Sequence, residues 1–184
     1  MSELSFYSGP RTHDRVRGVI IWTAEIITAA VIALTVFFWF GTTAEVTGRS
    51  MEPTLGYGSS VFLDTLDYRL TAPDRFDCVI FERGDDLIIK RIIGLPGETV
   101  QIRDGSVIIN GEQLDLPWTD ELILSAGTAA DPVDLGNDEY FVIGDNINGS
   151  DDSRSPSLGP VTESSITGRV WAVRSNGIMI SRVY

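Results

Sequence analysis

Residues 87–114 read LIIKRIIGLPGETVQIRDGSVIINGEQL, and their short apolar runs alternate with turn signals. Asp104-Gly105 and Asn110-Gly111 supply the positive φ angles that tight hairpins require. Leu95-Pro96-Gly97 places glycine directly after proline, as in a type II turn. This rhythm predicts the strands of an antiparallel β domain.

The same rhythm extends over most of the chain beyond residue 41, and we expect one mostly β domain over residues 42–184 with a single core. Residues 115–138 are acidic, rich in turn residues and weakly periodic, so they are predicted to be a loop or small flap. Apolar runs that we expect to be strands also occur at 60–66, 77–86, 139–146 and 166–184.

The N-terminal region differs from this domain. Val19 to Gly41 is an apolar run with one charged residue, Glu25, and about 23 residues at about 1.5 Å each are long enough to cross a bilayer. A cleaved signal peptide would have an apolar core of about 7 to 15 residues and a small-residue exit site. This run is longer and ends in FFWFGTTAE. We therefore predict a single transmembrane helix at residues 19–41.

Charge predicts the orientation of this helix. Arg11, Arg15 and Arg17 precede the run, whereas the first twenty residues after it contain only Arg49. Positive residues stay on the cytoplasmic side. Residues 1–18 are thus expected to form a cytoplasmic tail, and residues 42–184 an extracytoplasmic domain of a single-pass protein in the cell membrane.

Composition excludes several kinds of chemistry. The 14 Lys and Arg residues against 26 Asp and Glu give a net charge of -12, which argues against a nucleic-acid partner. The chain has one histidine, His13, and one cysteine, Cys78. One histidine and one cysteine are too few for a structural or His-ligated zinc site or an internal disulfide. A Ser-His-Asp triad or a Cys-His dyad would depend on His13, which lies in the predicted cytoplasmic tail. We expect no metal and no cofactor.

A serine and a lysine remain as candidates for nucleophilic catalysis. Ser50 precedes a proline-containing turn in residues 48–55, which taken alone is ordinary turn chemistry. Lys90 is the one lysine beside thirteen arginines, and it stands among isoleucines. Burial lowers the pKa of an ammonium, and a neutral lysine can activate a serine as a base. A solvated surface lysine is the alternative.

Residues 144–154, GDNINGSDDSR, follow a predicted strand and are polar and turn-rich. A calcium-binding EF-hand loop is the alternative reading, but the closing glutamate and the flanking helices are absent. Taken alone, the segment could equally be a solvated loop.

Together and in this order, the three segments resemble bacterial type I signal peptidase, a membrane-anchored Ser/Lys endopeptidase that removes signal peptides from exported proteins. The resemblance implies an all-β coiled-barrel catalytic domain in its compact form. The matching blocks are S-M-x-P-T at Ser50–Thr54, K-R-I-I-G-L-P-G-E at Lys90–Glu98 and G-D-N-x-x-x-S-x-D-S-R at Gly144–Arg154, with weaker matches at 77–81, 158–161 and 166–169.

The resemblance also implies roles for individual residues. Ser50 would be the nucleophile, Lys90 the general base, and Ser150 the hydroxyl that orients the lysine amine. The oxyanion hole would use the Ser50 backbone N–H. Some members have a serine hydroxyl where this chain has Gly48, so the hole would rely on backbone groups. Many members have arginine after G-D-N, where this chain has Ile147.

Other residues would support the site or bind substrate. Met51, with strand residues near Lys90, would wall two shallow apolar pockets for a substrate added as an extended strand. The expected substrates are secreted preproteins with signal peptides, cut after small residues of the A-x-A type beside the lipid bilayer. The charged residues that would brace the site are Arg91, Asp145, Asp152 and Arg154.

Two other functions stay open at this stage: a specialised peptidase for pilin-like substrates, and a non-catalytic membrane-anchored binding domain. A self-cleaving repressor-type Ser/Lys protein would carry a DNA-binding N-terminus in place of the apolar run. Signal peptidases of the eukaryotic type use histidine in place of lysine, and the single His13 lies in the predicted tail.

Overall fold

The computed structural model describes residues 12–64, 71–84, 86–175 and 179–182. The chain divides into two compact units, Met1–Phe40 and Gly41–Tyr184. Residues 1–11 of the predicted tail lie outside the described residues. Each unit is considered by itself below.

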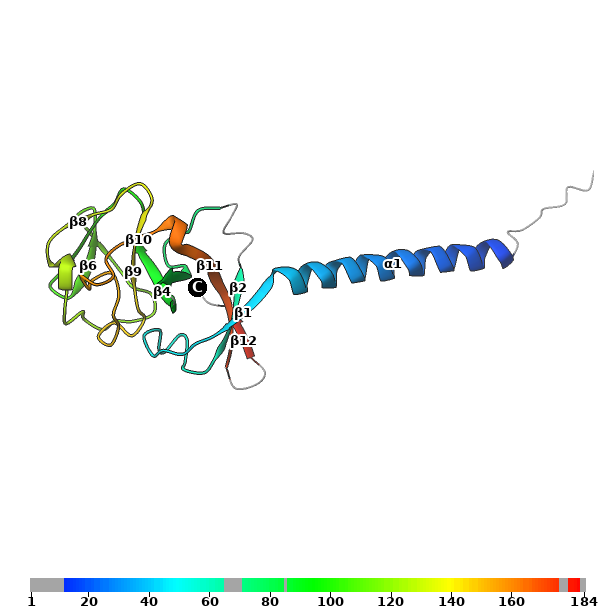
Figure 1. The fold of residues 1–184 in the computed structure, drawn as a ribbon, viewed down its shortest axis with the longest axis horizontal. Helices are drawn as coiled ribbons and strands as arrows, with labels where there is room; N and C mark the ends of the chain where they lie inside the picture. The colour runs from blue at the N-terminus through cyan, green and yellow to red at the C-terminus, as the bar shows by residue number, and fades with distance from the viewer. Residues whose placement is uncertain (1–11, 65–70, 85, 176–178, 183–184) are drawn as a thin grey trace, which may run out of the picture. The chain divides into compact units, whose positions relative to one another are not determined.

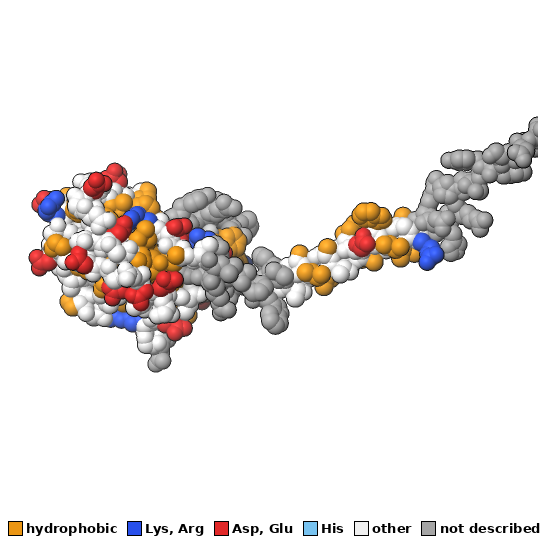
Figure 2. All heavy atoms as spheres, turned by 90° about the horizontal axis from the view of Figure 1, so that it is seen from above, with side chains coloured by type: hydrophobic (Ala, Val, Ile, Leu, Met, Phe, Trp, Pro, Cys, Tyr) orange, Lys and Arg blue, Asp and Glu red, His pale blue; other side chains and the backbone are white. Residues whose placement is uncertain are grey.

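The first unit is one helix, α1 (Thr12–Phe40). Its stretch Val16–Thr35 has a mean hydropathy of 1.9 and is long and apolar enough to cross a membrane. Hydrophobic side chains are spread along the part of the helix seen in Figure 2. The hydroxyls of Thr23, Thr28 and Thr35 each donate a hydrogen bond to a carbonyl three or four residues earlier, so these polar groups are satisfied within the helix. Helix α1 begins before the predicted residue 19, and Gly41 already belongs to a strand.

The second unit consists mainly of antiparallel strands in two sheets (Figure 1), which confirms the predicted mostly β fold. The larger sheet has the order β1-β2-β11-β3-β4-β9-β10, with β12 paired to β11. Its strands are β1 (Gly41–Glu45), β2 (Ser60–Asp64), β3 (Cys78–Arg83), β4 (Asp86–Gly94), β9 (Glu139–Ile143), β10 (Val161–Thr162), β11 (Ile166–Ser175) and β12 (Met179–Arg182).

The smaller sheet has the order β7-β6-β5-β8. Its two hairpin turns follow the prediction, since Asp104 and Gly105 have φ angles of 54° and 78°, and Asn110 and Gly111 have 52° and 88°. Paired positive φ angles match the right-handed twist of the flanking strands. The strands are β5 (Thr99–Arg103), β6 (Ser106–Ile109), β7 (Glu112–Leu114) and β8 (Val133–Asp134).

Residues 115–138 are more ordered than their composition suggests. They contain the short 3-10 helix η2 (Gly127–Ala130) and strand β8, which pairs with β5. Trp118, Ile123 and Leu135 pack against the apolar cluster between β4, β5, β6 and β9. A few apolar anchors at irregular spacing therefore fold a segment that has no strand or helix periodicity. A second 3-10 helix, η3 (Glu163–Ser165), precedes β11.

Candidate active site

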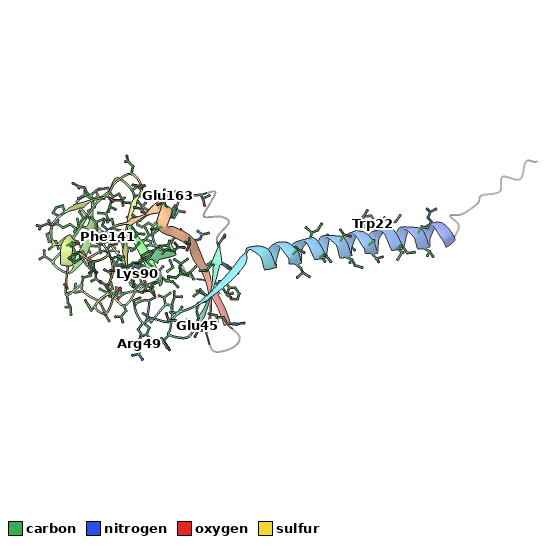
Figure 3. All side chains as sticks on the ribbon, viewed as in Figure 1. Trp22, Glu45, Arg49, Lys90, Phe141 and Glu163 are labelled. Atoms are coloured by element: carbon green, nitrogen blue, oxygen red, sulfur yellow. The ribbon has the colours of Figure 1, made fainter. Side chains whose placement is uncertain are left out.

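The fold brings Ser50 and Lys90 together from distant parts of the sequence. Lys90 lies in β4 opposite Val79 of β3, and only 3% of it is exposed. Ser50 lies in the turn after β1, and its Oγ is 2.6 Å from Lys90 Nζ. Figure 3 labels Lys90 on the β domain, near β4. The lone lysine is thus not a solvated surface residue.

Burial sets the electrostatics of this lysine. Removal from water lowers the pKa of Lys90 below its ordinary value of 10.5, against the opposing attraction of Asp152 and Asp151, and Arg154 lowers it further. The charged form is disfavoured because a buried ammonium loses hydration that its surroundings only partly replace. A larger share of Lys90 is therefore neutral near pH 7 than for a lysine in water.

The backbone around Ser50 is held by Asn146. The Asn146 N–H donates to the Ser50 carbonyl at 3.0 Å, and the Asn146 side-chain amide donates to the Arg49 carbonyl at 3.2 Å. Gly144 faces the same carbonyl, and a Cβ at that position would overlap the Ser50 carbonyl oxygen and Ser150 Oγ. Only glycine permits this approach.

Ser150 Oγ and the Ser50 carbonyl lie against the same face of Gly144. Its Oγ is buried and has no hydrogen-bond partner among the described residues. A buried hydroxyl without a partner is costly, and in native structures it asks for an explanation. No bond from Ser150 to Lys90 is seen in the described part of the chain, so its role in orienting the lysine stays a prediction.

Two buried ion pairs fix the loop that follows β9. Arg91 forms a two-pronged pair with Asp145, at 2.8 and 2.6 Å, and their side chains are 1% and 0% exposed. Burial lowers the pKa of Arg91, but the hydrogen bonds to Asp145 together with the negative charge nearby raise it overall. Asp152 and Arg154 form the second pair. Asp152 also accepts the Gly144 N–H at 3.1 Å, so both pairs connect directly to the residues around Ser50.

A cavity of about 260 Å³ opens beside Ser50. We call it the Ser50 pocket. Met51, which is 1% exposed, forms part of its wall. A Cβ placed on Gly48 would lie 4.0 Å from Ser50 N and Oγ, so position 48 adjoins Ser50. The lining residues are Glu45, Val46, Thr47, Gly48, Ser50, Met51, Asp86, Leu87, Ile88 and Ile89.

Two further kinds of site were considered among the described residues: a cysteine nucleophile and a metal centre. Cys78 is buried, and burial raises the pKa of its thiol to about 12, so the reactive thiolate is disfavoured. Within the described residues, no group of three or more His, Cys, Asp or Glu side chains could hold a metal ion.

Three residues near the site were not assigned a role from sequence. Asn146 and Gly144 stand inside the 144–154 block, where their turn composition gave no sign of contact with residues 49–50. Trp118 comes from the 115–138 segment, and its ring lies 4.6 Å from the Arg91 guanidinium. An isolated tryptophan in an acidic, irregular stretch carries no periodic signal that could place it there.

Comparison with known proteins identifies the family. The profile described as "Signal peptidase, peptidase S26" matches residues 19–174. A probable signal peptidase I-2 of Synechocystis sp. is 33% identical over 84% of this chain and 74% of the relative. Signal peptidase I S of Bacillus subtilis is 34% identical over 83% of this chain and 86% of the relative.

A crystal structure of a signal peptidase I from Enterococcus faecalis is 32% identical in sequence, with a TM-score of 0.46, and covers 54% of this chain and 97% of that one. The family and these relatives identify the chain as a serine peptidase, a hydrolase. The chain belongs to the signal peptidase family, peptidase S26.

Proposed function

We propose that this protein is a membrane-anchored signal peptidase that cleaves preproteins with a Ser50 nucleophile and a Lys90 general base. The observation that carries the proposal is the 2.6 Å separation between Ser50 Oγ and Lys90 Nζ, with the lysine buried. That distance lies within the reach that proton transfer requires.

The reaction proceeds in two halves. Neutral Lys90 takes the proton from Ser50 as Oγ attacks the scissile carbonyl, and the resulting ammonium then gives a proton to the departing amine. Water, activated by the same lysine, hydrolyses the acyl-enzyme and frees Ser50. Ser150, whose buried hydroxyl has no other hydrogen-bond partner among the described residues, orients the lysine amine. The ion pairs of Arg91 with Asp145 and of Asp152 with Arg154 hold the loop after β9, which carries Ser150, in place.

The oxyanion is stabilised by backbone groups near Ser50. The Ser50 N–H is the main donor, because it adjoins the attacking oxygen. Gly48 contributes no side chain, although it stands next to Ser50. The fixed Ser50 carbonyl, held by Asn146, keeps the peptide planes on either side of the nucleophile oriented for this role.

The substrate binds as an added strand beside β4. In the described pairings, β4 contacts β9 only from Arg91 onward, so residues 86–90 have β3 as their one strand partner. An extended peptide can use such a free edge. The Ser50 pocket beside it takes the small residues at -3 and -1 of an A-x-A site, with Met51 as part of its wall.

Helix α1 anchors the enzyme in the lipid bilayer of the cell membrane as a single span. By the positive-inside rule, residues 1–18 are cytoplasmic and 42–184 are extracytoplasmic. The surface of the β domain in Figure 2 is dotted with Asp and Glu, and the net charge of -12 disfavours nucleic acid and anionic lipid alike. Tethering near the bilayer raises the effective concentration of a signal peptide that is still embedded.

The test is cleavage of a preprotein with an A-x-A site by the detergent-solubilised full chain. We expect one cut after the last alanine, located by mass spectrometry, and no cut by Ser50→Ala. A matched preprotein with a bulky residue at -1 should stay intact. If folded wild-type protein leaves the A-x-A preprotein uncut, a binding role replaces the peptidase.

The pH dependence should report Lys90. A neutral amine is required, so kcat/KM should rise with pH through the pKa of Lys90, and the midpoint should lie below the ordinary lysine value of 10.5. Asp151→Asn removes a negative charge that favours the ammonium, so the midpoint should fall further. Amine labelling checks both values, because Lys90 and the N-terminus are the only amines. A midpoint at or above 10.5 in the wild type would contradict this role.

A further inference from the structure

A second cavity of about 320 Å³ lies beside Ser150. We call it the Leu124 pocket. It shares none of its lining with the Ser50 pocket, but Ser50 and Ser150 lie close together, because a Cβ on Gly144 would overlap both the Ser50 carbonyl oxygen and Ser150 Oγ. The residues that line it are Leu124, Ser125, Gly127, Ile147, Asn148, Ser150, Asp152, Arg154, Ser155 and Pro156.

The outer wall of this pocket is fixed by hydrogen bonds. The Asn148 side chain accepts from the Leu124 N–H at 2.9 Å and donates to the Leu122 carbonyl at 3.1 Å. Residues 122–124 are thereby pinned to the loop that carries Ser150. Leu124 nevertheless remains 83% exposed. Its side chain therefore adds exposed apolar surface beside the cavity.

The two charged side chains that line the pocket, Asp152 and Arg154, are already paired with each other. The Arg154 guanidinium donates to both Asp152 oxygens and to the carbonyls of Ile147 and Ser125. Since both charges are paired and buried, the pocket offers the apolar side chains of Leu124 and Pro156, whereas Ile147, at 1% exposed, belongs to the buried core. The complement of the pocket is a neutral or apolar peptide segment rather than an ionic group.

We propose that the Leu124 pocket binds the first residues of the mature protein, those that follow the cleaved bond. The inference rests on the proposed function, in which the Ser50 pocket takes the signal-peptide side. An extended chain advances about 3.3 Å per residue, and Ser150 Oγ lies against the same face of Gly144 as the Ser50 carbonyl, so the first mature residues of a substrate held at Ser50 can reach Ser150. Leu124 is then a specificity-determining residue for the mature side.

Two peptide substrates with the same A-x-A signal-peptide segment test this. One continues for several mature residues with an apolar side chain at +2, and the other ends in a small p-nitroanilide leaving group. For Leu124→Ser in the full-length enzyme, we expect kcat/KM to fall about tenfold on the first substrate and to stay unchanged on the anilide. Leu122→Ser is the matched control, because Leu122 is also exposed, at 61%, but does not line this pocket.

Each other outcome overturns the proposal. Equal losses on both substrates, equal effects of the two leucine variants, or a loss seen only in lipid vesicles would assign Leu124 to a different contact. If wild-type enzyme cleaves neither substrate, the proposed function fails first. If it cleaves both and Leu124→Ser has no effect, the peptidase stands and only the mature-side pocket is rejected.

Discussion

Lys90→Arg should lower kcat/KM on a preprotein by at least about 10³-fold. The guanidinium stays protonated at every pH that the enzyme survives, so it cannot accept the Ser50 proton across the 2.6 Å that separates the two side chains. Wild type and variant are compared by rates of preprotein cleavage. Raising the pH should not restore the variant, because no neutral base forms.

A second variant distinguishes loss of the base from loss of folding. Lys90→Met keeps an unbranched side chain of similar length and removes the charge from a site that is only 3% exposed. It should fold, as judged by thermal unfolding, and be as inactive as Lys90→Arg. If Lys90→Met kept more than about a tenth of wild-type kcat/KM, Lys90 would not be the base, because a general base contributes about 10²-fold or more.

Asp145→Ala should lower the free energy of unfolding by about 3–5 kcal/mol, because it removes the carboxylate that balances the charge of the buried Arg91 guanidinium. Arg91 is 1% exposed, and its two short bonds to Asp145 cannot be replaced by water without opening the loop. Denaturant unfolding of the full chain in detergent measures the loss. Because Asp145 adjoins Asn146, the residual folded enzyme should also cleave more slowly.

Two further variants isolate the cause. Arg91→Met combined with Asp145→Leu should recover most of the lost stability, since an apolar pair of similar volume carries no desolvated charge. Arg83→Gln breaks the exposed pair with Asp151 at 3.3 Å and should change the free energy of unfolding by less than about 1 kcal/mol. If Asp145→Ala proved no more harmful than Arg83→Gln, the buried pair would not hold this loop.

Much of the β architecture could be predicted because its signals are local. The turn at Asn110-Gly111 and the apolar runs around it need only neighbouring residues to be interpreted. The 115–138 segment could not be resolved in the same way, because Trp118 and Ile123 are held by partners distant in the sequence. Strand β8 has two residues and depends wholly on its pairing with β5.

The residues of the candidate site could likewise be predicted only in part. Lys90 stands out because it is the single lysine of the sequence, and both Ser50 and Lys90 lie in blocks that resemble the family's motifs. The short distance between their side chains, however, depends on how β4 packs against the turn after β1. The Asn146 bond to the Ser50 carbonyl joins residues nearly a hundred positions apart. Leu124 has no sequence signal at all, since a lone exposed leucine is common on protein surfaces.

The unpaired edge at residues 86–90 of β4 could also allow self-association. An edge that accepts a peptide strand could equally pair with the same edge of a second copy, which is how β proteins begin to aggregate. Asp86 and Glu45 both line the Ser50 pocket beside that edge, so a second copy on the same edge would bring a second set of these carboxylates near them. Because like charges repel at short range, we expect these carboxylates to disfavour self-association at this edge while leaving it available to a peptide.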